Sequence, residues 1–172
     1  MPSVWKPNVT VAALIERKGR FLLVEENTAD GVRLNQPAGH LEPGESIVAA
    51  CARETLEETA FAFTPTHLLG VYLWRSAADT AWLRFAFTGE LGAFDPSRAL
   101  DEGIIRTLWL TADELSARQA EHRSPLVARC VRDYRAGQRF GLEALYAHTD
   151  VAQASASGPF AIAALVGNGT TT

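Results

Sequence analysis

Three glutamates in the segment 46–61 constrain this chain more than any other feature of its sequence. Glu54, Glu57 and Glu58 stand at positions i, i+3 and i+4 of a stretch without glycine or proline, and strong helix formers fill that stretch. A helix is therefore predicted, with the three carboxylates on one face. Like charges so placed cost roughly 0.2–0.5 kcal/mol per pair, and the macrodipole disfavours anions near a helix C-terminus. Such a face is expected to hold a cation, and carboxylate oxygens suit Mg²⁺.

The alternative for the three glutamates alone is a solvated acidic surface, and the longer pattern around them favours the metal site. A glycine is followed after five residues by a glutamate, after seven more by Arg-Glu, and after two more by Glu-Glu; these positions, with an apolar one at the end, are Gly39, Glu45, Arg53, Glu54, Glu57, Glu58 and Phe61. The pattern resembles the Nudix box, the signature of a family that hydrolyses a nucleoside diphosphate linked to another group. Thr55 replaces an aliphatic residue and Ala60 replaces a glycine. Neither change removes a metal ligand, so we expect them to alter only packing and the helix exit.

The resemblance implies a set of metal-site and catalytic residues. Mg²⁺, or Mn²⁺ in its place, would be held by Glu54, Glu57, Glu58 and the backbone carbonyl of Ala38. Glu45 and Arg53 are expected to form an ion pair that orients the helix against its preceding loop. The group that takes the proton from water is left open between Glu54 and an acid of the loop 101–102, where Glu102 is preferred to Asp101 and a solvated turn is the alternative.

Substrate contacts are predicted on two strands and on the loop before the helix. Trp74, Trp82 and Arg84 lie on adjacent expected strands, where an aromatic ring would stack on a base or pyrimidine and Arg84 would meet phosphate. The alternative is that these side chains belong to the core or to a sheet edge. Gln36 and His40 flank the metal loop and are further candidates, although His40 also fits a solvated loop.

The pattern of apolar runs predicts an α/β protein. Strands are expected at 9–15, 21–24, 67–74, 81–87 and 104–110, with a hairpin turn at Lys18-Gly19 and helices after Thr111 and Pro125. With the resemblance, this order implies a Nudix-type α/β/α sandwich with a mixed β-sheet over residues 1–149. Residues 150–172, rich in Ala, Ser, Gly and Thr, are predicted to be a disordered tail, with a short docked helix at 160–166 as the alternative.

Composition limits the class of protein. The chain has 172 residues, a net charge of −4 and no long apolar run, so a cytoplasmic protein without a membrane span is expected. The acidic balance argues against nucleic-acid binding. Cys51 and Cys130 have no metal-binding spacing and are expected to be reduced thiols. A small-molecule pyrophosphate is the expected partner, and the oligomer is left open between monomer and homodimer.

Segments outside the box narrow the expected activity. The stretches 6–12, 35–42, 122–127 and 134–139 resemble the NudJ phosphatase subgroup of the Nudix family. That resemblance implies release of orthophosphate from nucleoside tri- and diphosphates and from thiamine-pathway pyrophosphates. Two alternatives stay open: a house-cleaning pyrophosphatase that yields nucleoside monophosphate plus pyrophosphate, and a nucleotide-binding Nudix module without activity.

Overall fold

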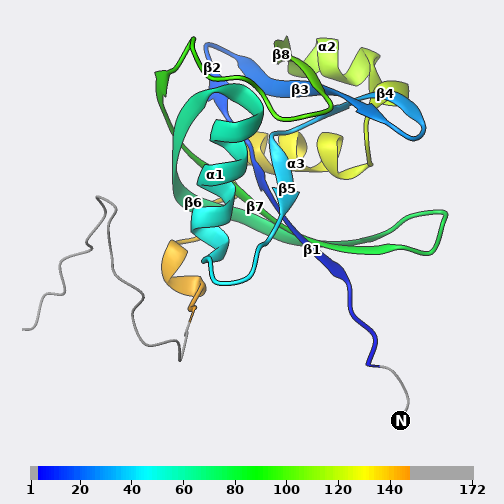
Figure 1. Ribbon diagram of the computed structural model, residues 1–172, viewed down its shortest axis with the longest axis vertical. Helices are drawn as coiled ribbons and strands as arrows, with labels where there is room; N and C mark the ends of the chain where they lie inside the picture. The colour runs from blue at the N-terminus through cyan, green and yellow to red at the C-terminus, as the bar shows by residue number, and fades with distance from the viewer. Residues whose placement is uncertain (1–3, 148–172) are drawn as a thin grey trace, which may run out of the picture.

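The computed structural model describes residues 4–147, so the predicted tail at 150–172 lies outside the described residues (Figure 1). The part described contains eight strands, three α-helices and two 3₁₀ helices. In chain order they are β1 (Asn8–Ala13), β2 (Glu16–Arg17), β3 (Arg20–Thr28), β4 (Gly31–Asn35), β5 (Ala38–His40), α1 (Ile47–Thr59), β6 (Phe61–Arg75), β7 (Ala81–Phe94), β8 (Ile104–Thr111), α2 (Ala112–Ala117), η1 (Gln119–Glu121), α3 (Leu126–Arg135) and η2 (Leu142–Ala144).

The strands form two four-stranded sheets. The first sheet has the order β5-β1-β7-β6, in which β1 and β7 are parallel and the other pairs antiparallel. In the second sheet β3 is central and pairs antiparallel with β2, β4 and β8. The first sheet is thus mixed, as expected.

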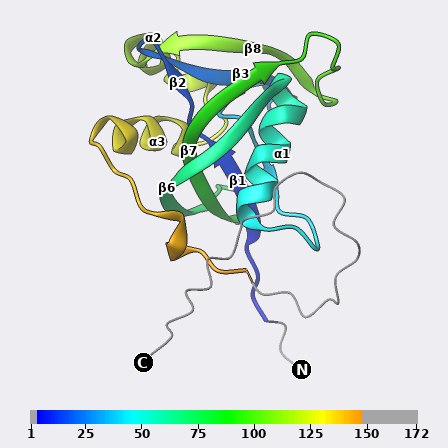
Figure 2. The same ribbon diagram turned by 90° about the vertical axis from the view of Figure 1, so that its left-hand side faces the viewer.

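Helices cover both faces of the first sheet, and Figure 2 shows α1 and α3 on opposite sides of its strands. Successive residues of β1 serve different layers, because side chains alternate along a strand. Ala12 packs in the layer under α2 and α3, whereas Val11 and Ala13 pack in the layer under α1. The predicted α/β/α sandwich is therefore confirmed.

Several local predictions are confirmed. Lys18 and Gly19 both have positive φ, 54° and 78°, as a two-residue hairpin turn between β2 and β3 requires. Thr111 caps α2 in a complete capping box with Glu114. Both cysteines are buried free thiols.

Other elements differ from expectation. The strand β4 was not predicted, β5 lies in the stretch expected to be the loop before the helix, and β6 and β7 extend well beyond the expected 67–74 and 81–87. The helix that carries the glutamates ends at Thr59, and Phe61 already belongs to β6. These differences arise because strand pairing is set by distant partners and leaves only a weak local signal. No helix within residues 4–147 has the length and apolarity needed to cross a membrane.

Candidate active site

Helix α1 carries the acidic face, and its two ends are fixed by capping. The Ser46 side chain accepts a hydrogen bond from the Ala49 N–H at the start, which satisfies an otherwise unpaired donor of the first turn. At the other end Ala60 adopts the left-handed conformation with φ 59°. A glycine would take that conformation without strain. The buried Thr55 hydroxyl donates to the Cys51 carbonyl at 2.7 Å, so the helix accommodates both departures from the Nudix box.

Two of the three predicted helix ligands lie in a compact carboxylate cluster with a third acid from another loop. One oxygen each of Glu54, Glu57 and Asp101 lie within 4.8 Å of one another. Asp101 is held there by its backbone N–H, which donates to the Glu57 carbonyl at 3.1 Å. Glu102, the acid preferred from the sequence, is exposed and outside this cluster; its role as general base stays a prediction.

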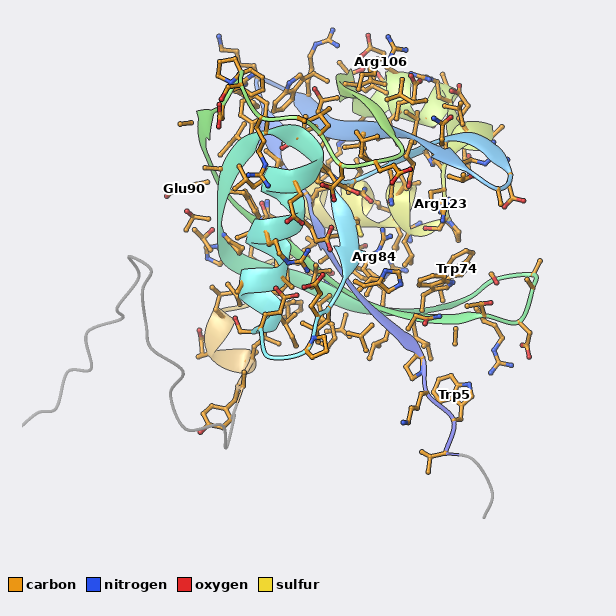
Figure 3. All side chains as sticks on the ribbon, in the orientation of Figure 1. Trp5, Trp74, Arg84, Glu90, Arg106 and Arg123 are labelled. Carbon is orange, nitrogen blue, oxygen red and sulfur yellow. The ribbon has the colours of Figure 1, made fainter. Side chains whose placement is uncertain are left out.

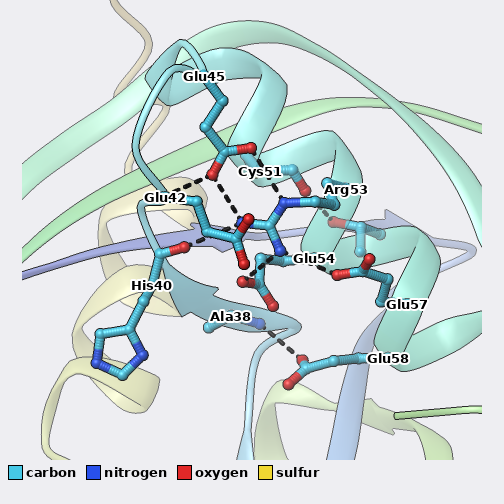
Figure 4. A network of polar contacts seen from close by, with 10 residues as sticks. Ala38, His40, Glu42, Glu45, Cys51, Arg53, Glu54, Glu57 and Glu58 are labelled. Atoms are coloured by element: carbon cyan, nitrogen blue, oxygen red, sulfur yellow. Dashed lines mark hydrogen bonds and ion pairs between the residues drawn. The ribbon is translucent and has the colours of Figure 1, made fainter.

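Arg53 ties the helix to the preceding loop, as Figure 4 shows. Its guanidinium donates twice to Glu45, at 3.0 and 2.7 Å, and also to Glu54 at 2.8 Å and Glu57 at 2.9 Å. A further bond reaches the His40 carbonyl at 3.0 Å. The expected Glu45–Arg53 pair is therefore present and bidentate, and the same cation holds two acids of the cluster in place.

Gly39 is explained by its closeness to Glu54. A Cβ at position 39 would lie 2.1 Å from the Glu54 carboxylate, so any larger residue there would displace this carboxylate from its position. The Glu54 side chain is largely buried, and desolvation raises the pKa of its carboxyl against the opposing effect of Arg53.

Glu58 occupies a different position from the other helix acids. Its Oε2 accepts a hydrogen bond from the Ala38 N–H at 2.8 Å, which places the Ala38 backbone beside the acids; its carbonyl as a ligand stays a prediction. Burial, and to a smaller extent the neighbouring carboxylates, raise the pKa of Glu58 to about 8 against the opposing effect of that hydrogen bond. Without a metal, the fold therefore favours the neutral carboxylic acid of Glu58 over its charged form.

A pocket of about 530 Å³ opens beside these acids. Its floor is the first sheet, its opposite wall is the second sheet, and α1 and the segment before α3 close its sides. The residues that line it include Thr10, His40, Trp74, Trp82 and Arg84 on the first sheet, Glu26, Arg33 and Asn35 on the second, Glu54 and Glu58 on α1, and Arg123 before α3. Figure 3 labels Arg84, Trp74 and Arg123, which come from separate elements.

Arg84 is a buried cation without an ion pair. Its side chain is only 7% exposed, no carboxylate among residues 4–147 lies within 4.0 Å of it, and its Nη1 makes only long bonds of 3.4 Å to the amide oxygens of Asn35 and Gln36. Burial lowers the pKa of its guanidinium. Because an uncompensated buried charge is costly, this arrangement fits a pocket built for an anion.

The described residues contain four buried side-chain atoms without a hydrogen-bond partner, and three of them belong to pocket residues. These are Thr10 Oγ1, Glu26 Oε1 and Arg84 Nε. Buried polar atoms are normally paired, so the pocket is a surface that a polar ligand would complete.

The predicted substrate residues divide into two groups. Trp74 and Trp82 face each other across β6 and β7, and with His40, whose ring lies 5.7 Å from that of Trp82, they line the pocket. Gln36 is fully buried and outside the lining; its amide donates to the Val127 carbonyl at 2.9 Å. Gln36 therefore supports Arg84 from behind, and a direct substrate contact by Gln36 has no geometric support.

Glu26 and Arg33 are pocket residues that sequence reasoning missed. They are directly opposite each other on β3 and β4. Arg33 lies in a stretch to which the sequence analysis assigned no element, and its alternation with Asn35 on a strand is the signal that could have indicated this placement.

The donor set fits a hard divalent cation. Carboxylate oxygens from Glu54, Glu57 and Asp101 converge, Glu58 lies next to them, and a pocket with a buried cation adjoins. Mg²⁺ takes a few carboxylates together with substrate phosphates, which matches acids on one wall and Arg84 on the floor.

Comparison with known proteins decides the family. The NUDIX domain profile matches residues 5–130, and that match includes all the acids of the site. The chain belongs to the Nudix family. Phosphatase NudJ from Escherichia coli strain K12 and from Shigella boydii are each 41% identical to it over 140 residues, which is 81% of this chain and 91% of theirs.

Solved Nudix structures agree with the fold. A NUDIX hydrolase from Nitrosomonas europaea superposes with a TM-score of 0.81 at 54% identity, covering 83% of this chain and 98% of its own. A MutT NUDIX hydrolase from Burkholderia pseudomallei, 21% identical over 75% of this chain and 98% of its own, gives a TM-score of 0.65 and shares the fold. This Nudix chain is accordingly a hydrolase of phosphoric anhydrides, and the NudJ-like resemblance found in its sequence is confirmed.

Proposed function

We propose that this Nudix hydrolase depends on Mg²⁺, for which Mn²⁺ can substitute, and releases orthophosphate from nucleoside tri- and diphosphates and from thiamine-pathway pyrophosphates. The observation that carries the proposal is the juxtaposition of the acid cluster with the buried, unpaired Arg84 in one pocket. The relatives called Phosphatase NudJ support the phosphatase assignment.

Each wall of the pocket has a defined part in this proposal. Glu54, Glu57 and Asp101, with Glu58 beside them, would hold the cation, which neutralises phosphate charge and positions water when bound. Arg84 binds a phosphate oxygen from the pocket floor, oriented by Asn35 and Gln36.

The proton acceptor is chosen by position. Glu54 borders the pocket and is aligned by Arg53, whereas Glu102 neither lines the pocket nor joins the acid cluster. We therefore place the general base at Glu54, within reach of water at the phosphate.

The organic part of the substrate would lie at the outer end of the pocket. Trp74 and Trp82 offer aromatic faces there, and stacking on an aromatic face tolerates different rings. We therefore expect a broad substrate range.

Product analysis in ¹⁸O-labelled water tests the proposal. Adenosine triphosphate, adenosine diphosphate and thiamine diphosphate should each yield labelled orthophosphate or the labelled shortened product, and chelation of divalent ions should abolish turnover. Pyrophosphate as the main product from a triphosphate would instead support the house-cleaning alternative. Binding without turnover at saturating Mg²⁺ would support the non-catalytic module.

A further inference from the structure

Three arginines line the pocket in addition to its acids. They are Arg33, Arg84 and Arg123, and none of them forms an ion pair with a carboxylate of residues 4–147. The Nη1 of Arg33 donates to the Val32 carbonyl at 3.0 Å. Arg123 is exposed, and its guanidinium donates no hydrogen bond to another residue of the part described. Like charges in one pocket repel each other, so a ligand with several negative charges would stabilise this arrangement.

The segment before α3 fixes the direction of Arg123. His122 forms a parallel β-bridge with Leu34 of β4, and the Arg123 N–H donates to the Leu34 carbonyl at 2.8 Å. Because side chains alternate along paired strands, Arg123 and Asn35 lie on one face of this pairing, and both line the pocket. His122 lies on the other face, where it lines a separate cavity between α2 and α3. Pairing with β4 therefore directs Arg123 into the pocket.

Arg84 and Arg123 follow each other across the pocket. In the view of Figure 3, Arg84 lies between α1 and the two residues Trp74 and Arg123. Asn35 connects the two arginines, because its Oδ1 lies 3.4 Å from Arg84 Nη1 and Arg123 is its neighbour on the same face of the pairing with β4. The charge of Arg123 also contributes to the lowered pKa of Arg84. A chain of phosphates that begins at the acids of α1 would therefore meet Arg84 first and Arg123 next.

The number of phosphates decides whether a substrate extends to Arg123. When the terminal phosphate lies at the acids of α1, a diphosphate has one further phosphate, which Arg84 would bind. A triphosphate has two further phosphates, and the additional one would lie at Arg123, beside the organic group at Trp74. A guanidinium matches a phosphate group through two parallel N–H bonds, and the donors of Arg123 have no other partner among residues 4–147. Arg123 is thus placed to distinguish the two lengths.

We propose that Arg123 is a specificity-determining residue, which binds the phosphate nearest the organic group and makes the enzyme prefer triphosphates to diphosphates. The proposal rests on the hydrolysis proposed above and names the class of substrate that the site favours. Arg33 adds positive charge to the same pocket, but one of its donors is already bonded to the backbone. The loss of Arg123 should therefore be felt mainly by substrates with a third phosphate.

Equilibrium binding of non-hydrolysable analogues tests this assignment without turnover. An adenosine triphosphate with a β,γ-imido bridge and an adenosine diphosphate with an α,β-methylene bridge are titrated calorimetrically, in Mg²⁺, into the full-length wild type, Arg123→Gln and Arg135→Gln. Arg135 is an exposed arginine at the end of α3 and lines the other cavity, so Arg135→Gln makes the same charge change outside the pocket. Arg123→Gln should weaken the triphosphate analogue about 10-fold and leave the diphosphate analogue close to wild type. Arg135→Gln should leave both affinities close to wild type.

Steady-state kinetics with adenosine triphosphate and adenosine diphosphate give a second measure. Arg123→Gln should raise KM for the triphosphate and retain kcat, because the phosphate that Arg123 binds is remote from the bond that breaks. Arg123→Lys keeps the charge and should recover part of the triphosphate preference. Equal losses for the triphosphate and the diphosphate would show a structural role and overturn the proposal. Unchanged triphosphate affinity in a folded Arg123→Gln protein would overturn it as well.

Failure of the underlying function gives a different result. If wild type released pyrophosphate from a triphosphate while Arg123→Gln selectively lost affinity for the triphosphate analogue, the proposed position of cleavage would be wrong and the selection of triphosphates by Arg123 would stand. If wild type released orthophosphate as proposed, but Arg123→Gln kept the wild-type ratio of triphosphate to diphosphate affinity, only the role of Arg123 would be refuted.

Discussion

Two adjacent glutamates of β3, Glu25 and Glu26, differ in whether the fold supplies a partner for their charge. On one side, called here the paired side, Glu25 accepts hydrogen bonds from Arg106 at 2.7 Å and Arg118 at 3.3 Å, and its pKa is lowered chiefly by the Arg106 bond. On the other, the pocket side, Glu26, Glu58 and Arg84 line one pocket, and Glu26 Oε1 and Arg84 Nε have no hydrogen-bond partner among the described residues. The protein pairs the charge of Glu25 within the fold and forms no ion pair between Arg84 and the pocket acids of residues 4–147.

This difference predicts which charged residues affect the stability of the fold and which affect activity. Charges that find partners within the fold contribute to stability, each surface pair by about 0–1 kcal/mol. Charges that are buried and unpaired lower stability and persist where a function requires them. Substitutions on the two sides should therefore act on different measurements.

The largest expected effect is on turnover from the acids of α1. Glu57→Gln and Glu58→Gln should each lower kcat at least about 100-fold, and Glu58→Gln should melt no lower than wild type without metal, because burial and the neighbouring carboxylates disfavour the charge of Glu58. Steady-state kinetics in saturating Mg²⁺ and a thermal melt measure the two quantities. Near wild-type turnover in both variants would remove the metal site from α1.

Glu25→Gln is the matched test on the paired side. It should leave kcat close to wild type and lower the melting temperature by about 2–4 °C, equivalent to about 1 kcal/mol in a chain of this size. A large loss of turnover with an unchanged melt would show that the two sides are not separate.

Replacement of the buried guanidinium should give the next largest effect. Arg84→Met should lower kcat/KM about 10- to 100-fold, as expected for a lost hydrogen bond to a charged group. Its stability should be equal or greater, because an apolar side chain of similar length replaces an unpaired buried charge. Arg106→Met, on the paired side, should lower stability and retain kcat/KM; the reverse outcome for the two arginines would contradict the comparison.

The pH dependence of metal-free stability should have opposite signs on the two sides. Glu58 has its pKa raised from 4.5 to about 8, so between these pH values the unfolded chain loses a proton that the folded protein keeps. The free energy of unfolding of wild type should therefore fall relative to Glu58→Gln as pH rises from about 4.5 to about 8, and level off above. Denaturant titrations with chelator at several pH values measure this difference.

Glu25 supplies the control for that sign. Its pKa is lowered, so its stabilising contribution is present above the unfolded value of 4.5 and is lost as pH falls through the lower folded value. Wild type should thus lose stability relative to Glu25→Gln on acidification. Parallel curves for wild type and both variants would mean that neither environment shifts its carboxyl.

The smallest effect is expected at the exit of α1, away from both sides. Ala60 holds φ 59°, so Ala60→Gly should stabilise the protein by about 0.5–1 kcal/mol through relief of strain, with kcat unchanged. Ala49→Gly, at an exposed position inside the helix, should destabilise by a similar amount. Calorimetry measures both melting temperatures. If they shifted in the same direction in the two variants, the strain assigned to Ala60 would be wrong.

Local features of the fold were predictable from the sequence. The helix, its Ser46 start, the Lys18-Gly19 turn and the capping box at Thr111 each depend on residues a few positions apart, and the structure contains all of them. Strands β4 and β5 were missed because they are short and pair with distant segments. The lengths of β6 and β7 were missed because their outer halves lack a continuous apolar run.

The candidate site divides in the same manner. The glutamates of α1, Arg53 and Glu45 follow from spacing alone, since a helix fixes the positions of side chains three and four residues apart. The choice of Asp101 over Glu102 for the cluster depends on the hydrogen bond from the Asp101 N–H to α1. Gln36 is buried next to Arg84 and outside the pocket lining. This placement depends on how the two sheets pack, which no local pattern encodes.

The sequence by itself determined the acidic helix face and the Nudix family, because spacing along one helix translates directly into geometry. Tertiary structure alone decided which charges stay unpaired: β3 places Glu25 against two arginines and Glu26 at the pocket, where its Oε1 has no hydrogen-bond partner among the described residues, although the two residues are neighbours in the chain. The physical reason is that pairing and burial of a charge depend on what other elements bring within a few ångströms. At this pocket those elements are β1, β3, β4, β5, β6, β7, α1 and the segment before α3.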